Sequence, residues 1–167
     1  MLFRSHLAEI ALATGGYDQA EALLRESLAE IGSFPPLRYE VLSALACNAL
    51  QRGQGEQAKG YAVEALRIAS DPDHSTIRPP LLPVTTAARL LRDGGHSERA
   101  VELYALASSH AFVANSHWFH EIAGRHIAAA AESLPLEVVA AAQERGRARD
   151  LWETAKELLE ELTELKP

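Results

Sequence analysis

Residues 7–20 read LAEIALATGGYDQA, residues 45–58 read LACNALQRGQGEQA, and residues 87–100 read AARLLRDGGHSERA. The segments begin at residues 7, 45 and 87, so they are 38 and 42 residues apart. In each one, an alanine lies seven residues before a glycine, and a second alanine lies five residues after that glycine. Such a recurring spacing is the sequence signature of a repeat fold, in which each unit needs its neighbours to bury its apolar face.

Each repeat predicts a helical hairpin. Small side chains allow two antiparallel helices to approach closely, and a glycine supplies the left-handed backbone that ends the first helix. We therefore expect a helix, a short turn and a second helix in each unit, with alanines where the two helices meet. The expected pairs are Ala8 with Ala20, Ala46 with Ala58, and Ala88 with Ala100.

Proline and glycine residues set the expected boundaries. Proline is tolerated in the first turn of a helix, so Pro35-Pro36 restarts the chain after the first pair. A turn-rich linker from Asp71 to Ser75 separates the second pair from the third. The expected helix pairs are about 2–32, 37–70 and 81–110, within a first region of residues 1–110.

The pattern changes in residues 111–167, where we expect a degenerate cap of three helices. Asp150 and Glu153 form a capping box at the start of the last one. The three helices run from about 115 to 131, from about 135 to 146 and from about 150 to 165. The prediction is therefore an all-α solenoid of helix hairpins, with about nine helices and a C-terminal capping bundle.

The composition favours helices and argues against several functions. The chain of 167 residues holds 30 alanines and 24 leucines, but only four Phe, two Trp and four Tyr, which is typical of helical proteins. The net charge of −7 lacks the basic excess that nucleic-acid binding requires. The sequence contains no run of about 18 apolar residues, so we expect no membrane-spanning helix. The single cysteine, Cys47, is typical of a buried thiol in a reducing compartment. We therefore expect a cytoplasmic protein that binds neither nucleic acid nor membrane.

The first repeat resembles the tetratricopeptide repeat family. Its signature positions hold Leu7, Ala8, Gly15, Tyr17, Ala20, Leu24 and Ser27, with Leu24 where an aromatic residue is usual. The second and third repeats carry Gly55 and Ser97 in place of the tyrosine. The two connections between repeats are longer than is usual in the family, by about 4 and about 8 residues against a period of about 34 residues. The resemblance covers about residues 2–110 and implies a stack of hairpins that binds protein or peptide.

A second resemblance lies in residues 138–159. With Glu144-Arg145-Gly146-Arg147-Ala148 followed by Leu151 and Ala155, this stretch is similar to the ends of tetratricopeptide regions in large bacterial signalling ATPases, kinases and transcriptional regulators. It implies a C-terminal sensor or regulatory arm. The abrupt start of the helical pattern at Leu2 agrees with the expectation of a segment from such a longer chain.

The tetratricopeptide resemblance also implies where a ligand would bind. The first helix of each pair lines the concave surface of such a stack, and the repeat register selects the residues that project there. Arg89 and Arg92 would either anchor an acidic group at these positions or, as we favour, only solvate a helix face. The expected groove residues are Ser5, Glu9 and Leu12 in the first repeat, Ser43, Cys47 and Leu50 in the second, and Thr85, Arg89 and Arg92 in the third.

The sequence predicts no enzyme, no catalytic residue and no cofactor. No phosphate-binding glycine loop, nucleophile elbow or HExxH motif occurs. His117 and Glu121 are four residues apart and share a helix face, but a third metal ligand would have to come from elsewhere, because His126 points to the opposite side. We therefore expect no metal site.

Two other groups of residues leave alternatives open. Phe112, Trp118 and Phe119 fit either a core or a pocket, and a pocket would make the protein a small-molecule sensor. The run of Arg145, Arg147 and Arg149 fits either a phosphate patch or, as we favour, a helix junction with ion pairs.

The last expected helix carries an apolar stripe of Leu151, Ala155, Leu158, Leu159 and Leu162. Such a stripe either caps the stack or joins two copies as a homodimer. The sequence as a whole predicts a non-catalytic scaffold that binds protein or peptide. A regulatory arm of a larger protein and a small-molecule sensor are the alternatives.

Overall fold

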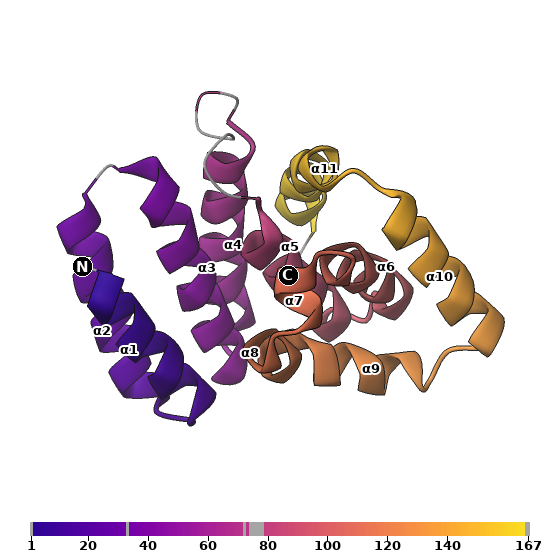
Figure 1. Cartoon of the computed structure of the whole chain (residues 1–167), viewed down its shortest axis with the longest axis horizontal. Helices are drawn as coiled ribbons and strands as arrows, with labels where there is room; N and C mark the ends of the chain where they lie inside the picture. The colour runs from indigo at the N-terminus through magenta and orange to yellow at the C-terminus, as the bar shows by residue number, and fades with distance from the viewer. Residues whose placement is uncertain (1, 33, 72, 74–78, 166–167) are drawn as a thin grey trace.

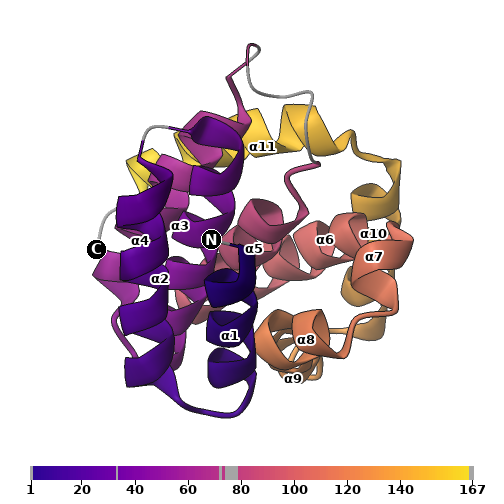
Figure 2. The ribbon, with the colours of Figure 1, turned by 60° about the vertical axis from the view of Figure 1, so that its left-hand side comes forward.

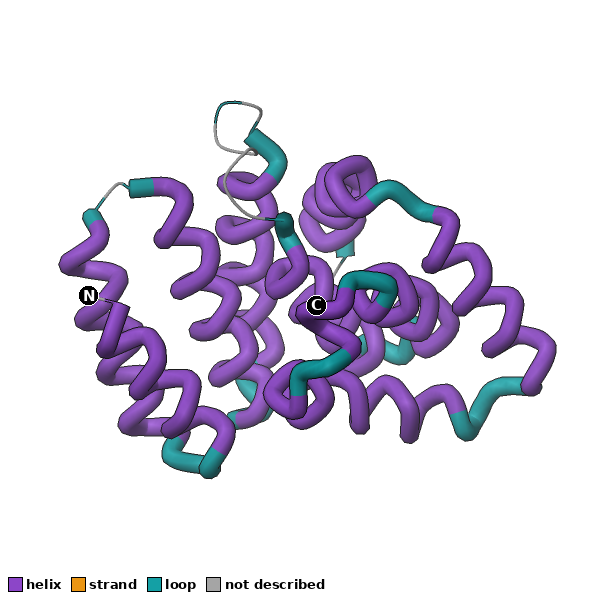
Figure 3. The backbone as a smooth tube through the Cα atoms, in the orientation of Figure 1, coloured by secondary structure: helices purple, strands orange, loops and turns teal. Residues whose placement is uncertain are grey.

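The computed structural model describes residues 2–32, 34–71, 73 and 79–165, and every regular element in these ranges is a helix (Figure 3). The prediction of an all-α fold is therefore confirmed. Two predicted features, the Ser5 side chain and most of the linker from Asp71 to Ser75, lie outside the described residues.

Six helices form three hairpins that follow one another from the N-terminus (Figure 1). The hairpins are α1 (Leu2–Ala13) with α2 (Tyr17–Ile31), α3 (Pro35–Gln51) with α4 (Gly55–Ala69), and α5 (Leu81–Asp93) with α6 (Ser97–Ser108). Helix α2 packs against α3, and α4 packs against α5, so each hairpin covers the next one. The helices begin and end within a few residues of the predicted bounds.

The three hairpin turns share one set of hydrogen bonds. In each turn, a glycine amide donates to the carbonyl three residues earlier, and the next amide donates to the carbonyl five residues earlier. This pair of bonds is the Schellman motif, which requires a left-handed residue. The glycines are Gly15, Gly53 and Gly95, with φ of 82°, 72° and 85°. The role that the sequence predicted for these glycines is therefore confirmed.

The alanines that mark the repeats are buried at the helix contacts. Each has at most 1% of its surface exposed, and the six are Ala8, Ala20, Ala46, Ala58, Ala88 and Ala100. A larger side chain in such a close-packed contact forces the helices apart at a cost of about 1–3 kcal/mol. The alanines therefore set the distance between the helices of each hairpin.

The remaining helices close around the third hairpin. Helix α7 (Ala111–Ala114) is a single turn that the sequence did not predict. A continuous helix follows, made of α8 (His117–Phe119), the π-helical turn η1 (His120–Gly124) and α9 (Arg125–Ala131). Helix α10 (Leu136–Ala148) packs against α6, and α11 (Leu151–Glu164) lies across α4 and α5 (Figures 1 and 2). Asp150 caps α11 as predicted, because its side chain accepts from the amides of Trp152 and Glu153 at 2.9 Å.

A glycine brings α10 close to α6. A Cβ added to Gly146 would stand 2.0 Å from the carbonyl oxygen of Glu102 and 3.0 Å from the Cβ of Ala105. Since rotation of a side chain moves neither a carbonyl oxygen nor a Cβ, only a shift of the backbone could relieve the clash. Glycine at this position therefore permits the packing of α10.

A buried carboxylate holds the same junction together. Glu102, which is 6% exposed, accepts hydrogen bonds from Arg99, Arg145 and Arg149 at 2.6, 3.1 and 3.1 Å. Arg149 also pairs with Glu157 of α11. The interpretation of residues 145–149 as a junction with ion pairs is therefore confirmed for two of its arginines, with partners from α6 and α11 rather than from neighbouring acids.

We predict that Gly53→Ala lowers the free energy of unfolding by about 1–2 kcal/mol, the cost of the left-handed conformation for an L-residue. The space around Gly53 is open, so the added methyl group meets no neighbour and the substitution measures backbone strain alone. Gly60, an exposed glycine within α4, also has open space and an ordinary φ. Gly60→Ala should therefore stabilise the protein by about 0.5–1 kcal/mol. Urea denaturation followed by circular dichroism measures the free energy of unfolding of both variants. Equal effects of the two substitutions would contradict the requirement for a left-handed residue at position 53.

Candidate functional site

The predicted groove is not open along its length. Six of its nine expected side chains are at most 7% exposed, namely Leu12, Ser43, Cys47, Leu50, Thr85 and Arg89. Arg92 is partly exposed, and Glu9 is exposed. The nine positions therefore do not form one continuous accessible groove, although Leu50 borders a separate surface pocket with Leu90 and Leu162.

The hydroxyls among these residues bond to their own helices. Ser43 donates to the carbonyl of Tyr39 at 2.8 Å, and Thr85 donates to the carbonyl of Leu81 at 2.7 Å. The two hydroxyls are therefore satisfied without a ligand.

Cys47 of α3 contacts α5, the first helix of the next hairpin. Its Sγ lies 3.3 Å from Oγ1 of Thr86, and burial raises the pKa of its thiol to about 11. The thiol is therefore protonated at neutral pH and a poor nucleophile. The expectation of a buried, unpaired cysteine is confirmed.

The two arginines expected to anchor an external acid bind an internal one. Arg89 Nε lies 3.2 Å from Oδ2 of Asp93, and Arg92 Nη1 lies 2.8 Å from Oδ1 of the same carboxylate. Arg89 Nη1 also donates to the carbonyl of Ile122, in the π-helical turn, at 3.0 Å. Arg89 therefore ties the C-terminal segment to α5 instead of presenting its charge to a ligand.

Two kinds of packing bury the predicted groove: the first helices pack against one another, as Cys47 does against Thr86, and the C-terminal segment packs against Arg89. Phe119, Ile122 and Ile127 share one hydrophobic core with Leu12 and Cys47. The helix over residues 117–131 therefore lies against α5 at the predicted groove position of Arg89, on the side of the first helices that we call the inner face. The repeat register could not predict this cover, because it describes only contacts between neighbouring hairpins.

A cavity of about 560 Å³ remains at one end of the inner face. It lies where α1, α3 and α5 meet α7 and α8, and both views place α1 beside α8 (Figures 1 and 2). Its lining includes Glu9, Tyr39, Glu40, Leu81, Phe112 and Trp118. Ligand sites in proteins commonly measure about 300–1,000 Å³, so this cavity is the candidate binding site.

Aromatic rings form one wall of this cavity. The ring centroids of Phe112 and Phe119 are 5.8 Å apart, and those of Trp118 and Phe119 are 5.1 Å apart, both edge to face. Phe119 is only 3% exposed, whereas Phe112 is 73% exposed. Phe119 therefore supports the wall from the core, and Phe112 forms an accessible rim.

Sequence reasoning missed Tyr39 and Leu81. Each lies four residues before a predicted groove position, Ser43 or Thr85, and so one turn earlier on the same helix face. An extension of the repeat register by one turn would have found both. Among the predicted groove residues, Glu9 is the one that lines the described cavity.

The histidines of α8 and η1 do not form a metal centre with other described residues. His117 Nε2 lies 4.0 Å from Oε1 of Glu121, so the two side chains share a face as predicted. No group of three or more His, Cys, Asp or Glu side chains in the described ranges could hold a metal ion.

The apolar stripe of α11 is used within the chain. Four of its five residues are at most 6% exposed, namely Leu151, Ala155, Leu158 and Leu162. They belong to the same core as residues of α4 and α5. In this structure the stripe caps the hairpins and is not available to a second copy.

The structure is that of an all-α helical-repeat protein whose C-terminal segment packs against the third hairpin. Comparison of the chain with protein-family models, curated proteins and solved structures finds no match. The tetratricopeptide assignment therefore stays a prediction. Within the described ranges, no helix is both long enough and apolar enough to cross a membrane.

His126 makes the stability of this packing sensitive to pH. Burial, aided by the charges of Arg89, Arg125 and Arg92, lowers its pKa from 6.5 to about 4. Its Nε2 is buried and has no hydrogen-bond partner among the described residues. Between these two pH values the unfolded chain binds the proton and the folded chain does not, so stability is lost as the pH falls.

We predict that the free energy of unfolding of the wild type falls more steeply from pH 6.5 to about pH 4 than that of His126→Gln. His120→Gln, which changes an exposed ring in the adjoining π-helical turn, is the matched control. Urea denaturation across this pH range provides the comparison. If the free energy of unfolding depended on pH in the same way for the wild type and His126→Gln, the lowered pKa of this ring would be contradicted.

Proposed function

We propose that the protein is a non-catalytic helical-repeat module that binds a protein or peptide segment in the cavity between α1, α3, α5, α7 and α8. The observation that carries this proposal is the cavity itself, which has an aromatic wall and a volume of about 560 Å³. An apolar side chain inserted between aromatic rings is the usual anchor of a peptide in a groove.

The distribution of exposure supports recognition at this end of the inner face. Phe112 is 73% exposed at the rim, and large exposed apolar side chains of this kind often mark interaction sites. Tyr39 and Leu81, at the opposite side of the cavity, are each 5% exposed. A partner would therefore meet a fixed floor and an accessible aromatic rim.

A small-molecule sensor is the second candidate. It is favoured by the size of the cavity and by the mixture of apolar walls with polar groups such as Ser116, Glu9 and Glu40. In either case, the role of a regulatory arm in a larger signalling ATPase, kinase or transcriptional regulator rests on the second sequence resemblance alone.

We predict that peptides selected from a random displayed library against the protein bind through Phe112. Phe112→Ala should weaken the selected peptides by about tenfold or more, because it removes an anchor that contributes more than about 1.4 kcal/mol. Phe34→Ala removes another exposed ring, 54% exposed and outside the cavity, and should leave binding unchanged. Isothermal titration calorimetry measures both affinities.

Failure to select any peptide would overturn the proposed function. Selected peptides that bind the Phe112→Ala variant as tightly as the wild type would place recognition elsewhere on the surface. Because Phe112 is mostly exposed, its replacement should leave the fold intact, which circular dichroism can verify.

A further inference from the structure

A second cavity, of about 370 Å³, lies between α6, η1, α9 and α10. It is separate from the aromatic cavity and shares no lining residue with it. Its apolar floor includes Val101 and Ile127, which are 4% and 3% exposed, and small side chains such as Ala105 and Ala128 leave the space open.

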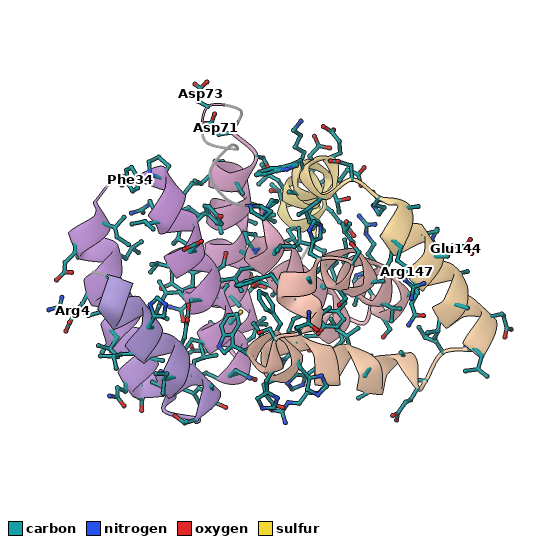
Figure 4. All side chains as sticks on the ribbon, viewed as in Figure 1. Arg4, Phe34, Asp71, Asp73, Glu144 and Arg147 are labelled. Atoms are coloured by element: carbon teal, nitrogen blue, oxygen red, sulfur yellow. The ribbon has the colours of Figure 1, made fainter. Side chains whose placement is uncertain are left out.

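The charge of this second cavity is opposite to that of the chain as a whole. Arg147 is the only charged side chain among its described lining residues, although the sequence carries 23 acidic residues. Arg145 and Arg149 pair with Glu102. Arg147, which lies between them, makes no ion pair or side-chain hydrogen bond within the described ranges. Figure 4 shows Arg147 on the side of α10 toward α6, whereas Glu144 points away.

Further polar groups stand beside this guanidinium. Gln143 lies one turn before Arg147 on α10 and therefore on the same face. Across the cavity, the phenol of Tyr104 contacts the hydroxyl of Ser108, and burial raises the pKa of the phenol. Tyr104 is therefore a neutral hydrogen-bond donor at physiological pH and does not repel an anion.

The π-helical turn positions Tyr104. A Cβ added to Gly124 would stand 2.4 Å from the phenol oxygen of Tyr104. Only a glycine at this position leaves the ring in its place against η1. Because a π-helical turn is uncommon and is often found at functional sites, its position beside an open cavity with a single unpaired cation agrees with a binding role.

We infer that this second cavity binds a small carboxylic acid with an apolar body. The carboxylate would pair with Arg147, and the apolar body would lie over Val101, Ile127 and Ala128. A guanidinium and a carboxylate match in charge and geometry, and the absence of acidic side chains from the described lining excludes a cation as the better ligand. This inference does not depend on the proposed binding of peptides at the aromatic cavity.

Decanoate and its neutral analogue decanol are the probes, titrated into the full chain by isothermal titration calorimetry. Decanoate should bind at least about tenfold more tightly than decanol, since only the acid can pair with Arg147. Arg147→Gln should reduce the affinity for decanoate to the level of decanol. Arg67→Gln is the matched control, because Arg67 on α4 also lacks a described ion pair and lies outside this cavity; it should have no effect.

A second variant tests the location independently of charge. Ala128 is exposed, so Ala128→Trp should fold and fill the cavity, which would abolish binding of both probes. Phe112→Ala should leave decanoate binding unchanged, and this outcome separates the second cavity from the aromatic one. The inference is overturned if decanoate does not bind, if decanol binds equally well, or if Arg147→Gln retains the affinity of the wild type.

Discussion

The contact between α5 and the segment 117–131 determines how much of the inner face is accessible at the third hairpin. Arg89, 7% exposed, donates to the carbonyl of Ile122 at 3.0 Å and pairs with Asp93. A hydrogen bond from a charged donor contributes about 1.5–3 kcal/mol, and Asp93, on the same helix and 31% exposed, orients the guanidinium toward this carbonyl. The guanidinium therefore holds the C-terminal segment firmly against the inner face, and the apolar contacts of Phe119 and Ile122 complete the cover.

This cover divides the inner face into a filled part and an open part. At the filled part, Cys47 and Leu12 become core residues, and the hairpins gain apolar burial that a short stack would otherwise lack. At the open part, the aromatic cavity remains between α1, α3 and α7–α8. The protein thus combines the local contacts of a repeat fold with long-range contacts that are typical of a globular domain.

Much of the fold could be predicted because it depends on local constraints. A left-handed residue is needed in a Schellman turn, so Gly15, Gly53 and Gly95 mark the three hairpins in the sequence. Asp150 could be predicted as a helix cap for the same local reason. The filling of the groove could not be predicted, because it arises from residues more than 30 positions away in the chain, such as Ile122 against Arg89. The close approach of Gly146 to Glu102 is equally invisible without the structure, since any glycine in a helix looks alike in sequence.

The accessibility of the inner face can be measured at Cys47. This residue is the only cysteine of the sequence and is 4% exposed. Its reaction with an excess of a chromophoric disulfide reagent at neutral pH reports directly whether that face is open. We expect labelling to proceed no faster than unfolding, because both the burial of the thiol and its raised pKa protect it. Rapid labelling of the native protein, at a rate close to that of an exposed thiol, would instead show that the inner face is open to solvent at Cys47.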